Sequence, residues 1–244
     1  IRAVAALGER LREGGFDAVL VHGYSTPLEW KASLAALRAR LPILVRGETH
    51  LREPRPLARR VLRSVAVRAF LRVVDGVLAI GTWNKDYWKS IGVEESQLEI
   101  GYYAVDNDRF ALEALAAGER ALVLRQEWGA TAASVVFVFS GKLIPRKEPL
   151  QLLEAFMGLK ADGDFHLVYI GSGPLEEELK KMAGNARKVH WMGFKNQSEM
   201  PAVYKAGDVV VLPSSSEAWG LVVNEAMAAG TPCIVSDQTG VSAD

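Results

Sequence analysis

Residues 208–230 read DVVVLPSSSEAWGLVVNEAMAAG, and this stretch decides the fold class. Residues 209–212 are consecutive aliphatic residues, which is typical of a strand that is buried on both faces. A polar loop follows Pro213, and residues 221–228 then read as a helix that Gly230 ends. A strand, a loop and a helix in this order predict one unit of a parallel sheet flanked by helices.

The same alternation runs along the rest of the chain. Candidate strands lie at 18–21, 43–45, 77–80, 98–102, 135–139, 166–170, 189–191, 209–212 and 233–235. Helix-like stretches lie at 28–40, 57–73, 85–91, 111–126, 149–159, 175–182, 199–205 and 221–228. Because strands and helices alternate, the sequence predicts a doubly wound α/β architecture.

A polar, turn-rich segment at 103–110 interrupts this alternation. We therefore predict two α/β domains, 1–105 and 106–244, with a ligand cleft at the carboxyl ends of their strands. The chain starts at Ile1 within a helix-like stretch and stops in a loop, so we expect a fragment of a longer protein. The alternative is a naturally short chain.

The composition is that of an ordinary globular protein. Of 244 residues, 49% are hydrophobic and 24% are charged, and 29 Lys and Arg balance 29 Asp and Glu. This balance gives no overall attraction to nucleic acid or membranes, and no apolar run approaches the roughly 18–20 residues of a spanning helix. The single cysteine, Cys233, excludes an internal disulfide and favours a cytoplasmic location.

The loop after the predicted strand at 135–139 carries three cations. Gly141 allows a sharp turn, and Lys142, Arg146 and Lys147 follow before the next helix begins. Cations beside a helix N-terminus favour the binding of a phosphate. A solvated basic loop is the alternative interpretation.

Two further loops between a strand and a helix suit a ligand. The loop at 170–174 contains Gly171 and Gly173, which permit close approach of the backbone. Its spacing is not that of a dinucleotide-binding fingerprint, because no third glycine follows. In the loop at 213–220, the amides of 219–221 open a helix and would point at an anion.

Two carboxylates flank that helix start. Glu217 precedes the helix, and Glu225 lies on it about two turns further along. Carboxylates accept hydrogen bonds from sugar hydroxyls and repel a bare phosphate, so the pair predicts hydroxyl groups on either side of a bound diphosphate. The alternatives are that Glu217 favours the helix dipole and that Glu225 is simply solvated.

Together these segments resemble the retaining glycosyltransferases of family 4 (group 1). The resemblance rests on 139–147 (FSGKLIPRK), 169–174 and 211–237, where Glu217 and Glu225 form the family's Glu-x7-Glu motif. The segment at 103–110 is similar to the family's interdomain segment.

The resemblance implies the GT-B fold, an α/β fold of two Rossmann-like domains whose parallel sheets face each other across a cleft. Residues 1–105 would form the acceptor-side domain, which looks incomplete. Residues 106–244 would form the domain that binds the nucleotide-sugar, without its last elements.

The resemblance also implies a role for each matched residue. Lys142 and Lys147 would bind the donor's diphosphate and stabilise the departing charge, although arginine is more usual at the position of Lys142. Glu217 would contact hydroxyls of the donor sugar, and Glu225 would bind the ribose hydroxyls. The remaining donor contacts would come from Gly141, from the amides of Trp219, Gly220 and Leu221, and from a nucleobase pocket with Gly171, Gly193 and Phe194.

The implied reaction moves a sugar from a nucleotide-sugar donor, a UDP- or GDP-sugar, to a glycan, lipid-linked or small-molecule acceptor with retention at the anomeric carbon. The resemblance implies no metal and no cofactor, and the sequence contains no His/Cys cluster. Two other function classes stay open. One is another GT-B enzyme, such as a sugar-nucleotide epimerase or a phosphorylase, and the other is a non-catalytic nucleotide-sugar-binding module.

The N-terminal half resembles the family less closely. The candidates for the acceptor side are His22 after the first strand and Arg46 and His50 after the second. A buried, hydrogen-bonded structural histidine is an equally good interpretation of each histidine.

Seven arginines and one acid lie in residues 51–72. Arg52, Arg55, Arg59 and Arg63 are spaced so that they could share one helix face. Such a helix could lie on an anionic membrane, which would place a cytoplasmic protein at the inner face of that membrane. The alternative, which we favour, is a solvated helix that packs on the N-terminal sheet. Nucleic acid is not an expected partner, because no recognition motif is present.

Overall fold

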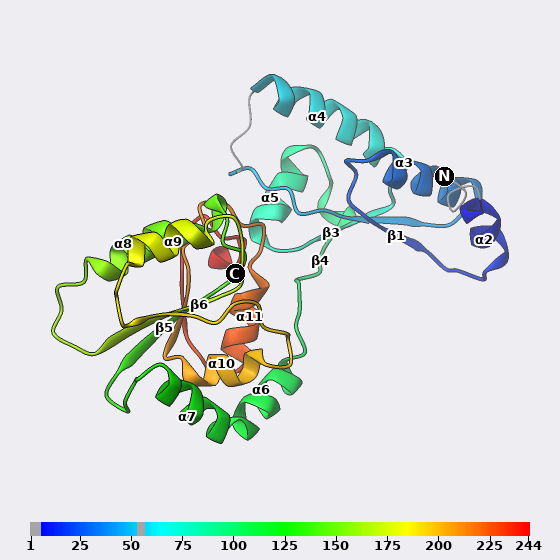
Figure 1. Ribbon diagram of the computed structural model, residues 1–244. Helices are drawn as coiled ribbons and strands as arrows, with labels where there is room; N and C mark the ends of the chain where they lie inside the picture. The colour runs from blue at the N-terminus through cyan, green and yellow to red at the C-terminus, as the bar shows by residue number, and fades with distance from the viewer. Residues whose placement is uncertain (1–5, 53–56) are drawn as a thin grey trace. The chain divides into compact units, whose positions relative to one another are not determined.

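The computed structural model describes residues 6–52 and 57–244 as two α/β units, each built around a parallel sheet (Figure 1). Unit 1 ends at Tyr103 and also contains Ala243–Asp244, and unit 2 comprises Ala104–Ser242. This division and the boundary predicted after residue 105 lie two residues apart.

Unit 1 has a four-stranded sheet in the order β1-β2-β3-β4, with all pairs parallel. Its elements are α2 (Leu7–Glu13), β1 (Val19–His22), α3 (Pro27–Arg38), β2 (Ile43–Arg46), α4 (Leu57–Leu71), β3 (Gly76–Ala79), α5 (Thr82–Ser90), η1 (Glu95–Gln97) and β4 (Leu98–Ile100). A capping box of Thr26 and Glu29 starts α3, and Pro27 occupies its first helical position.

The core of unit 1 lies between the sheet and its helices. Val45 and Val77 of the strands are buried together with Val67 and Phe70 of α4 and Trp88 of α5. The arginine-rich stretch therefore packs one side of α4 on the N-terminal sheet, which is the packing that we favoured.

Unit 2 has a five-stranded parallel sheet in the order β7-β6-β5-β8-β9. Its elements are α6 (Asn107–Ala116), α7 (Gly118–Glu127), β5 (Val135–Ser140), η2 (Pro145–Lys147), α8 (Pro149–Met157), β6 (Phe165–Ile170), α9 (Glu176–Ala183), β7 (Val189–Trp191), α10 (Met200–Ala206), β8 (Val209–Leu212), α11 (Leu221–Ala228), β9 (Cys233–Val235) and η3 (Gly240–Ala243). The chain runs outward from β5 to β7, returns to β8 beside β5 and then reaches β9. This reversal creates a topological switch point between β5 and β8, where open α/β sheets bind ligands.

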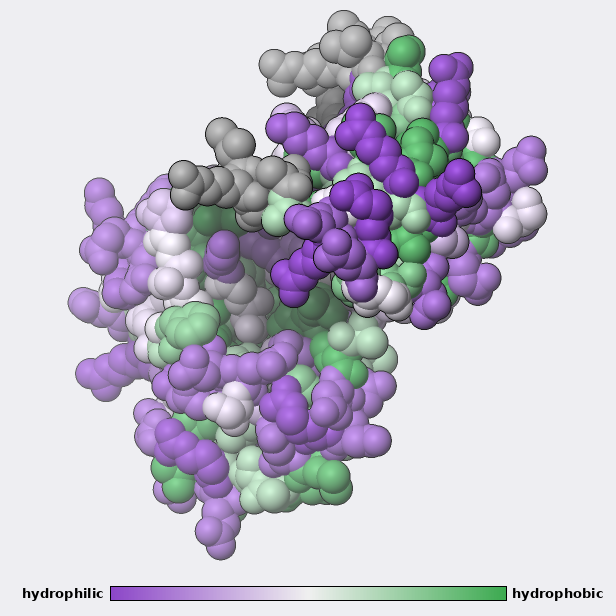
Figure 2. Space-filling model, turned by 90° about the vertical axis from the view of Figure 1, so that its right-hand side faces the viewer, coloured by the Kyte–Doolittle hydropathy of each residue, from purple (hydrophilic) through white to green (hydrophobic). Residues whose placement is uncertain are grey.

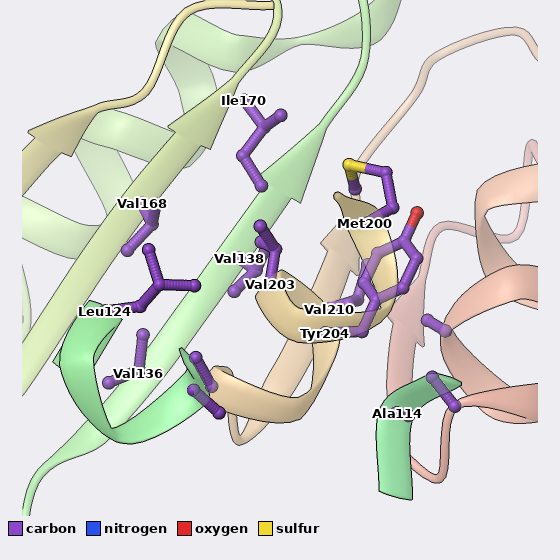
Figure 3. Packing of buried hydrophobic residues seen from close by; sticks show 14 of the residues in the cluster. Ala114, Leu124, Val136, Val138, Val168, Ile170, Met200, Val203, Tyr204 and Val210 are labelled. Atoms are coloured by element: carbon purple, nitrogen blue, oxygen red, sulfur yellow. The ribbon is translucent and has the colours of Figure 1, made fainter. Parts of the chain in front are cut away.

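Both faces of the unit 2 sheet are buried, as its consecutive apolar residues predict. On one face Val136, Val138 and Val168 pack with Leu124 of α7 and Tyr204 of α10 (Figure 3). The other face carries a second buried cluster, to which β5, β6, α8 and α9 contribute. Figure 1 shows α8 and α9 on one side of the sheet and α7 and α10 on the other.

Several expected elements have other bounds in the structure, and two of them differ in a way that the local sequence explains. The helix expected at 111–126 is two helices, α6 and α7, which meet at Gly118, a poor helix former. α6 begins as early as Asn107 because the Asp106 side chain accepts a hydrogen bond from the Arg109 N–H (3.0 Å) and caps the helix. The strand expected at 98–102 already ends at Ile100.

Within residues 6–52 and 57–244, no helix combines the length and the apolar character that a membrane span requires. Figure 2 shows one face of the molecule, on which hydrophilic residues predominate and hydrophobic residues are scattered among them. Scattered hydrophobic residues are normal on the surface of a globular protein.

A pair of histidines lies near the amino ends of β6 and β7. His166 Nδ1 is 3.0 Å from His190 Nε2, and the two rings stack with their centroids 5.3 Å apart. Burial, and then the charge of His166, lower the pKa of His190 to about 4 from 6.5. The unfolded chain therefore takes up a proton on this residue at a higher pH than the folded chain does.

We expect the His190→Gln variant to lose part of the acid sensitivity of the fold. In the wild type, the contribution of His190 to the free energy of unfolding is complete above pH 6.5 and is lost as the pH falls towards 4. Between pH 6.5 and 5 this loss amounts to about 1 kcal/mol for a partly exposed ring. Urea unfolding measures this loss in the wild type, in His190→Gln and in the control His22→Gln, whose histidine is exposed. An equal fall in the free energy of unfolding in all three proteins would contradict the prediction.

Candidate functional site

A pocket of about 530 Å³ lies at the carboxyl ends of β5 and β6 in unit 2. Its walls come from the loops after β5, β6 and β7 and from α10 and α11. The lining residues are Ser140, Gly141, Lys142, Ile170, Gly171, Ser172, Phe194, Lys195, Gln197, Met200 and Glu225. This size and position are those of a small-molecule site beside a topological switch point.

Glycines allow the loops after β5, β6 and β7 to touch at the pocket wall. Gly171 has a φ of +122°, and a Cβ on it would lie 2.0 Å from the Gly141 carbonyl oxygen. The Gly171 N–H donates to the Gly193 carbonyl (2.8 Å), and the Gly141 N–H donates to the Ile170 carbonyl (2.9 Å). The structure thus brings together the three glycines that the sequence indicates in separate loops.

Glu217 lies beside two cations from the loop after β5. Its Oε2 accepts a hydrogen bond from Lys147 Nζ, and Arg146 Nη1 lies 3.9 Å from the same oxygen. The side chains of Lys147 and Glu217 are only 13% and 14% exposed. A charge pair so shielded from water interacts more strongly than a surface pair, so each side chain holds the other in place.

Backbone hydrogen bonds hold the Glu217 loop from two sides. The Ser215 N–H donates to the Arg146 carbonyl (3.0 Å), and the Glu217 N–H donates to the Gln238 carbonyl (3.2 Å). The Gly240 N–H in turn donates to the Glu217 carbonyl (2.9 Å). No motif in the sequence indicates that the segment after β9 supports the site in this way.

Lys142 is exposed on the pocket wall. Among the described residues it forms no ion pair, unlike Lys147. The two predicted diphosphate lysines therefore differ in environment, because only Lys147 is tied to a carboxylate.

The start of α11 presents backbone amides. Gly220 precedes the helix with a φ of +106°, and the N–H groups of a first helical turn lack acceptors within the helix. Gly220 and Leu221 are therefore suitable donors to an anion. The Trp219 side chain is buried, and its Nε1 donates to Asn224 Oδ1 (2.8 Å). This side chain packs in the interior, so any ligand contact of Trp219 falls to its backbone.

Glu225 projects from α11 as one of the lining residues of the pocket. Its Oε2 accepts a hydrogen bond from the Tyr204 hydroxyl (2.8 Å), and its Oε1 lies 3.4 Å from Gln197 Nε2. Glu225 is therefore not simply solvated. No motif in the sequence indicates Tyr204 or Gln197.

Phe194 lines the pocket on the side after β7, and Gly193 precedes it in the chain. Phe194 is 73% exposed, and Gly193 has a φ of +62° that directs the chain past the strand end. Lys195 forms an ion pair with Glu199 (3.3 Å), which holds the next part of this segment. An exposed aromatic side chain on a pocket wall offers a face on which a planar group could stack.

The three acceptor-side candidates lie in unit 1. His22 is exposed at the end of β1, and the Arg46 guanidinium lies 4.3 Å from the centroid of the Tyr103 ring. His50 is buried with its ring 5.7 Å from the ring of Trp83. The burial of His50 fits the structural alternative better than a role in contact with a ligand.

The arginine-rich stretch is directed partly into unit 1. Arg63 Nη2 donates to Thr49 Oγ1 (2.8 Å), and Arg68 Nε donates to the Ile91 carbonyl (3.2 Å). Arg63 is therefore engaged within unit 1, and the Arg52 guanidinium lies 4.0 Å from the centroid of the Trp83 ring. Arg55 and the side chains of Arg59 and Arg60 lie outside the described residues.

No group of three or more His, Cys, Asp or Glu side chains in the described part of the chain could hold a metal ion. Two Asp-x-Asp sequences occur, at 106–108 and 162–164. Asp106 caps α6, and Asp164 pairs with Lys188 (2.7 Å) near the amino end of β6, opposite the pocket edge.

A family model described as glycosyl transferases group 1 matches residues 123–244, which are half of the chain. The chain belongs to this family. The matched part contains β5 to β9 with the whole pocket and both carboxylates of the Glu-x7-Glu motif.

The curated relatives of this member of the group 1 family are longer proteins. The uncharacterized glycosyltransferase MJ1607 of Methanocaldococcus jannaschii is 34% identical over 126 residues, which cover 50% of this chain and 32% of that protein. The UDP-Gal:alpha-D-GlcNAc-diphosphoundecaprenol alpha-1,3-galactosyltransferase of Escherichia coli is 27% identical over 98% of this chain and 62% of its own length. The D-inositol 3-phosphate glycosyltransferase of Corynebacterium glutamicum is 32% identical over 62% of this chain and 36% of its own length. The chain thus spans between 32% and 62% of the length of these relatives.

Solved structures share the fold over the whole chain. Alr3699/HepE of Anabaena, in complex with UDP, superposes with a TM-score of 0.76 at 20% identity, over 99% of this chain and 65% of that one. WaaG, a glycosyltransferase involved in lipopolysaccharide biosynthesis, superposes with a TM-score of 0.65 at 17% identity, over 99% and 78%. The expected α/β fold of GT-B type is confirmed.

We expect the Gly171→Ala variant to be destabilised by more than about 2 kcal/mol, because a methyl group overlaps the Gly141 carbonyl and the backbone angle is strained. Gly193→Ala is the matched control, since Gly193 also has a positive φ but nothing within 4 Å of an added Cβ. It should cost only about 1 kcal/mol. Urea unfolding measures both, and equal costs would show that the loops separate without strain.

Proposed function

We propose that this chain transfers a sugar from a nucleotide-sugar donor to an acceptor with retention at the anomeric carbon. The observation that carries the proposal is the arrangement at the carboxyl edge of unit 2. There, the Lys147–Glu217 pair, the amides at the start of α11 and the pocket with Glu225 lie on neighbouring strand ends. UDP- and GDP-sugars are the proposed donors, and the UDP and UDP-glucose complexes of HepE support the former.

The proposed diphosphate site combines point charges with backbone donors. Lys142 and Lys147 would attract the diphosphate, and the amides of Trp219, Gly220 and Leu221 would donate to its oxygens. As the bond to the sugar breaks, negative charge grows on the leaving diphosphate, and fixed donors stabilise that charge. In this proposal, cationic side chains of the protein neutralise the charge of the diphosphate in place of a metal ion, and no cofactor is needed.

The two glutamates would bind opposite ends of the donor. Glu217 would accept hydrogen bonds from hydroxyls of the transferred sugar, and its cationic neighbours compensate its charge close to the diphosphate. Glu225 would accept hydrogen bonds from the ribose hydroxyls. Gly141 and Gly171 would let the donor approach the backbone, while Gly193 and Phe194 would bound the nucleobase.

A sugar or lipid-linked acceptor is proposed for unit 1. The E. coli relative is named for a lipid diphosphate acceptor that carries GlcNAc, and it matches nearly the whole chain. His22 and Arg46 lie at the carboxyl ends of β1 and β2, where an acceptor would meet them. His50 would act from beneath the surface by supporting this edge.

The proposed location is the cytoplasm, with peripheral contact to the inner face of the membrane through residues 51–72. Support comes from the excess of arginine in this stretch and from the exposed residues Arg68 and Arg72. Contact with the membrane would bring the protein close to a lipid-linked acceptor.

We expect the Lys147→Ala variant to bind its nucleoside diphosphate about tenfold more weakly, because one cation is lost and Glu217 loses its main partner. Glu217→Gln should bind the nucleotide nearly as well but transfer sugar on the order of 100-fold more slowly. Titration calorimetry with UDP, GDP and ADP and a transfer assay with the corresponding nucleotide-sugars measure these effects.

Lys188→Ala is the control for these variants. Lys188 also forms an ion pair with a carboxylate, that of Asp164, but it lies at the opposite edge of the sheet. It should bind and react like the wild type. If all three variants lost nucleotide binding in proportion to their loss of thermal stability, the proposed roles of these residues would be contradicted. If the wild type bound none of the nucleotides, the proposed function would be contradicted.

We expect the chain to sediment with vesicles that contain phosphatidylglycerol and not with vesicles of phosphatidylcholine alone, and added salt should release it. The Arg59→Gln/Arg60→Gln variant should bind the anionic vesicles more weakly, whereas Arg10→Gln, outside the arginine-rich stretch, should not. Sedimentation that is equal for both lipids would contradict the proposed contact.

A further inference from the structure

The oxygens of Glu225 have unequal partners. The Tyr204 hydroxyl donates to Oε2 at 2.8 Å, whereas the nearest donor to Oε1 is Gln197 Nε2 at 3.4 Å. Glu225 and Gln197 line the pocket, and Tyr204 does not. One oxygen is therefore bound firmly to the protein interior, and the other has only a long contact to a second pocket residue.

Tyr204 is a rigid donor. Its side chain is fully buried, and its ring centroid lies 6.4 Å from that of Phe110. Its carbonyl accepts a hydrogen bond from Thr231 Oγ1 (2.8 Å), which fixes its backbone. Figure 3 shows its ring beside Met200 and Val210, with the hydroxyl oxygen at the edge of the apolar cluster. The hydroxyl therefore has one position from which to donate.

The Tyr204 hydroxyl stays protonated, as a hydrogen-bond donor must. Burial, and then the charge of Glu225, raise the pKa of the Tyr204 hydroxyl far above its usual value. The hydroxyl therefore keeps its proton and can only donate to the carboxylate. Oε1 of Glu225 is left to accept from a donor in the pocket.

We propose that Tyr204 is a positioning residue for ribose recognition. By holding Oε2 of Glu225, it directs Oε1 towards a ribose hydroxyl and makes the site selective for ribonucleotides over deoxyribonucleotides. This inference rests on the proposed donor site. A glutamate without such a bond samples several rotamers, and ordering it on binding would reduce the affinity. Tyr204 orders the side chain before the nucleotide arrives.

The first experiment measures the contribution of ribose in the wild type. Titration calorimetry with UDP, GDP and ADP identifies the bound nucleotide, and its 2′-deoxy and 3′-deoxy forms are then titrated. We expect at least one deoxy form to bind about tenfold more weakly. Binding of no nucleotide overturns the proposed function and this inference together. Equal binding of the ribo form and both deoxy forms leaves the proposed function standing and overturns this inference alone.

The second experiment removes the Tyr204 oxygen. In Tyr204→Phe the affinity for the ribonucleotide should fall about tenfold while that for the deoxy form stays unchanged, so their ratio approaches one. Tyr169→Phe is the matched control, because its hydroxyl is also buried and donates at 2.7 Å, but to the Pro149 carbonyl. It should keep the wild-type ratio. A folded Tyr204→Phe protein that also keeps that ratio overturns the proposal.

A double variant covers the case in which Tyr204→Phe alone does not fold, because Glu225 then loses its firmest partner. Tyr204→Phe/Glu225→Ala has neither a charge nor a hydrogen-bond acceptor in the side chain at position 225, and it is compared with Glu225→Ala. If Tyr204 acts only through Glu225, both proteins bind the ribonucleotide equally. Further loss of affinity in the double variant at equal thermal stability would assign Tyr204 to packing and overturn the proposal.

Discussion

The candidate site depends on a direct contact between backbone segments at the ends of β5, β6 and β7. The Gly171 amide reaches the Gly193 carbonyl at 2.8 Å, and no Cβ fits between Gly171 and the Gly141 carbonyl. A parallel sheet always brings the carboxyl ends of its strands to one edge, but side chains ordinarily hold the loops apart. Because glycine removes that separation, this wall of the pocket offers backbone groups to a ligand.

The Glu217 loop also makes direct contacts with neighbouring segments, and a Cβ on Gly240 would lie 2.0 Å from the Ala218 carbonyl oxygen. The loop after β5 supplies Lys147 to its side chain and the Arg146 carbonyl to its backbone, and the segment after β9 supplies the Gln238 carbonyl. Two segments far apart in the chain therefore set the position of one carboxylate. A change in either segment would move Glu217 although Glu217 itself is unchanged.

The sequence predicts the strands, their parallel arrangement and the loops of this edge, because apolar runs and glycines act locally. It does not predict the partners of the charged groups. Nothing near Glu225 indicates Tyr204, since their bond joins α10 to α11, and the buried surroundings of His50 arise from packing in unit 1. The break between α6 and α7 is missed because the apolar pattern of a helix continues across Gly118, where the two helices meet.

The two motif carboxylates show why such partners matter for function. Glu217 is paired with a cation and has a second one at 3.9 Å, so an anion could lie near it without repulsion. In the described part of the chain, Glu225 has only a phenol and an amide as hydrogen-bond partners, and no ion pair compensates its charge. Helical rise places it roughly 6 Å along the axis from Leu221. α11 therefore runs from amides that favour an anion to a carboxylate that repels one. The proposed nucleoside diphosphate has the same order of groups, phosphates and then ribose hydroxyls, and this order favours one direction of binding along the helix.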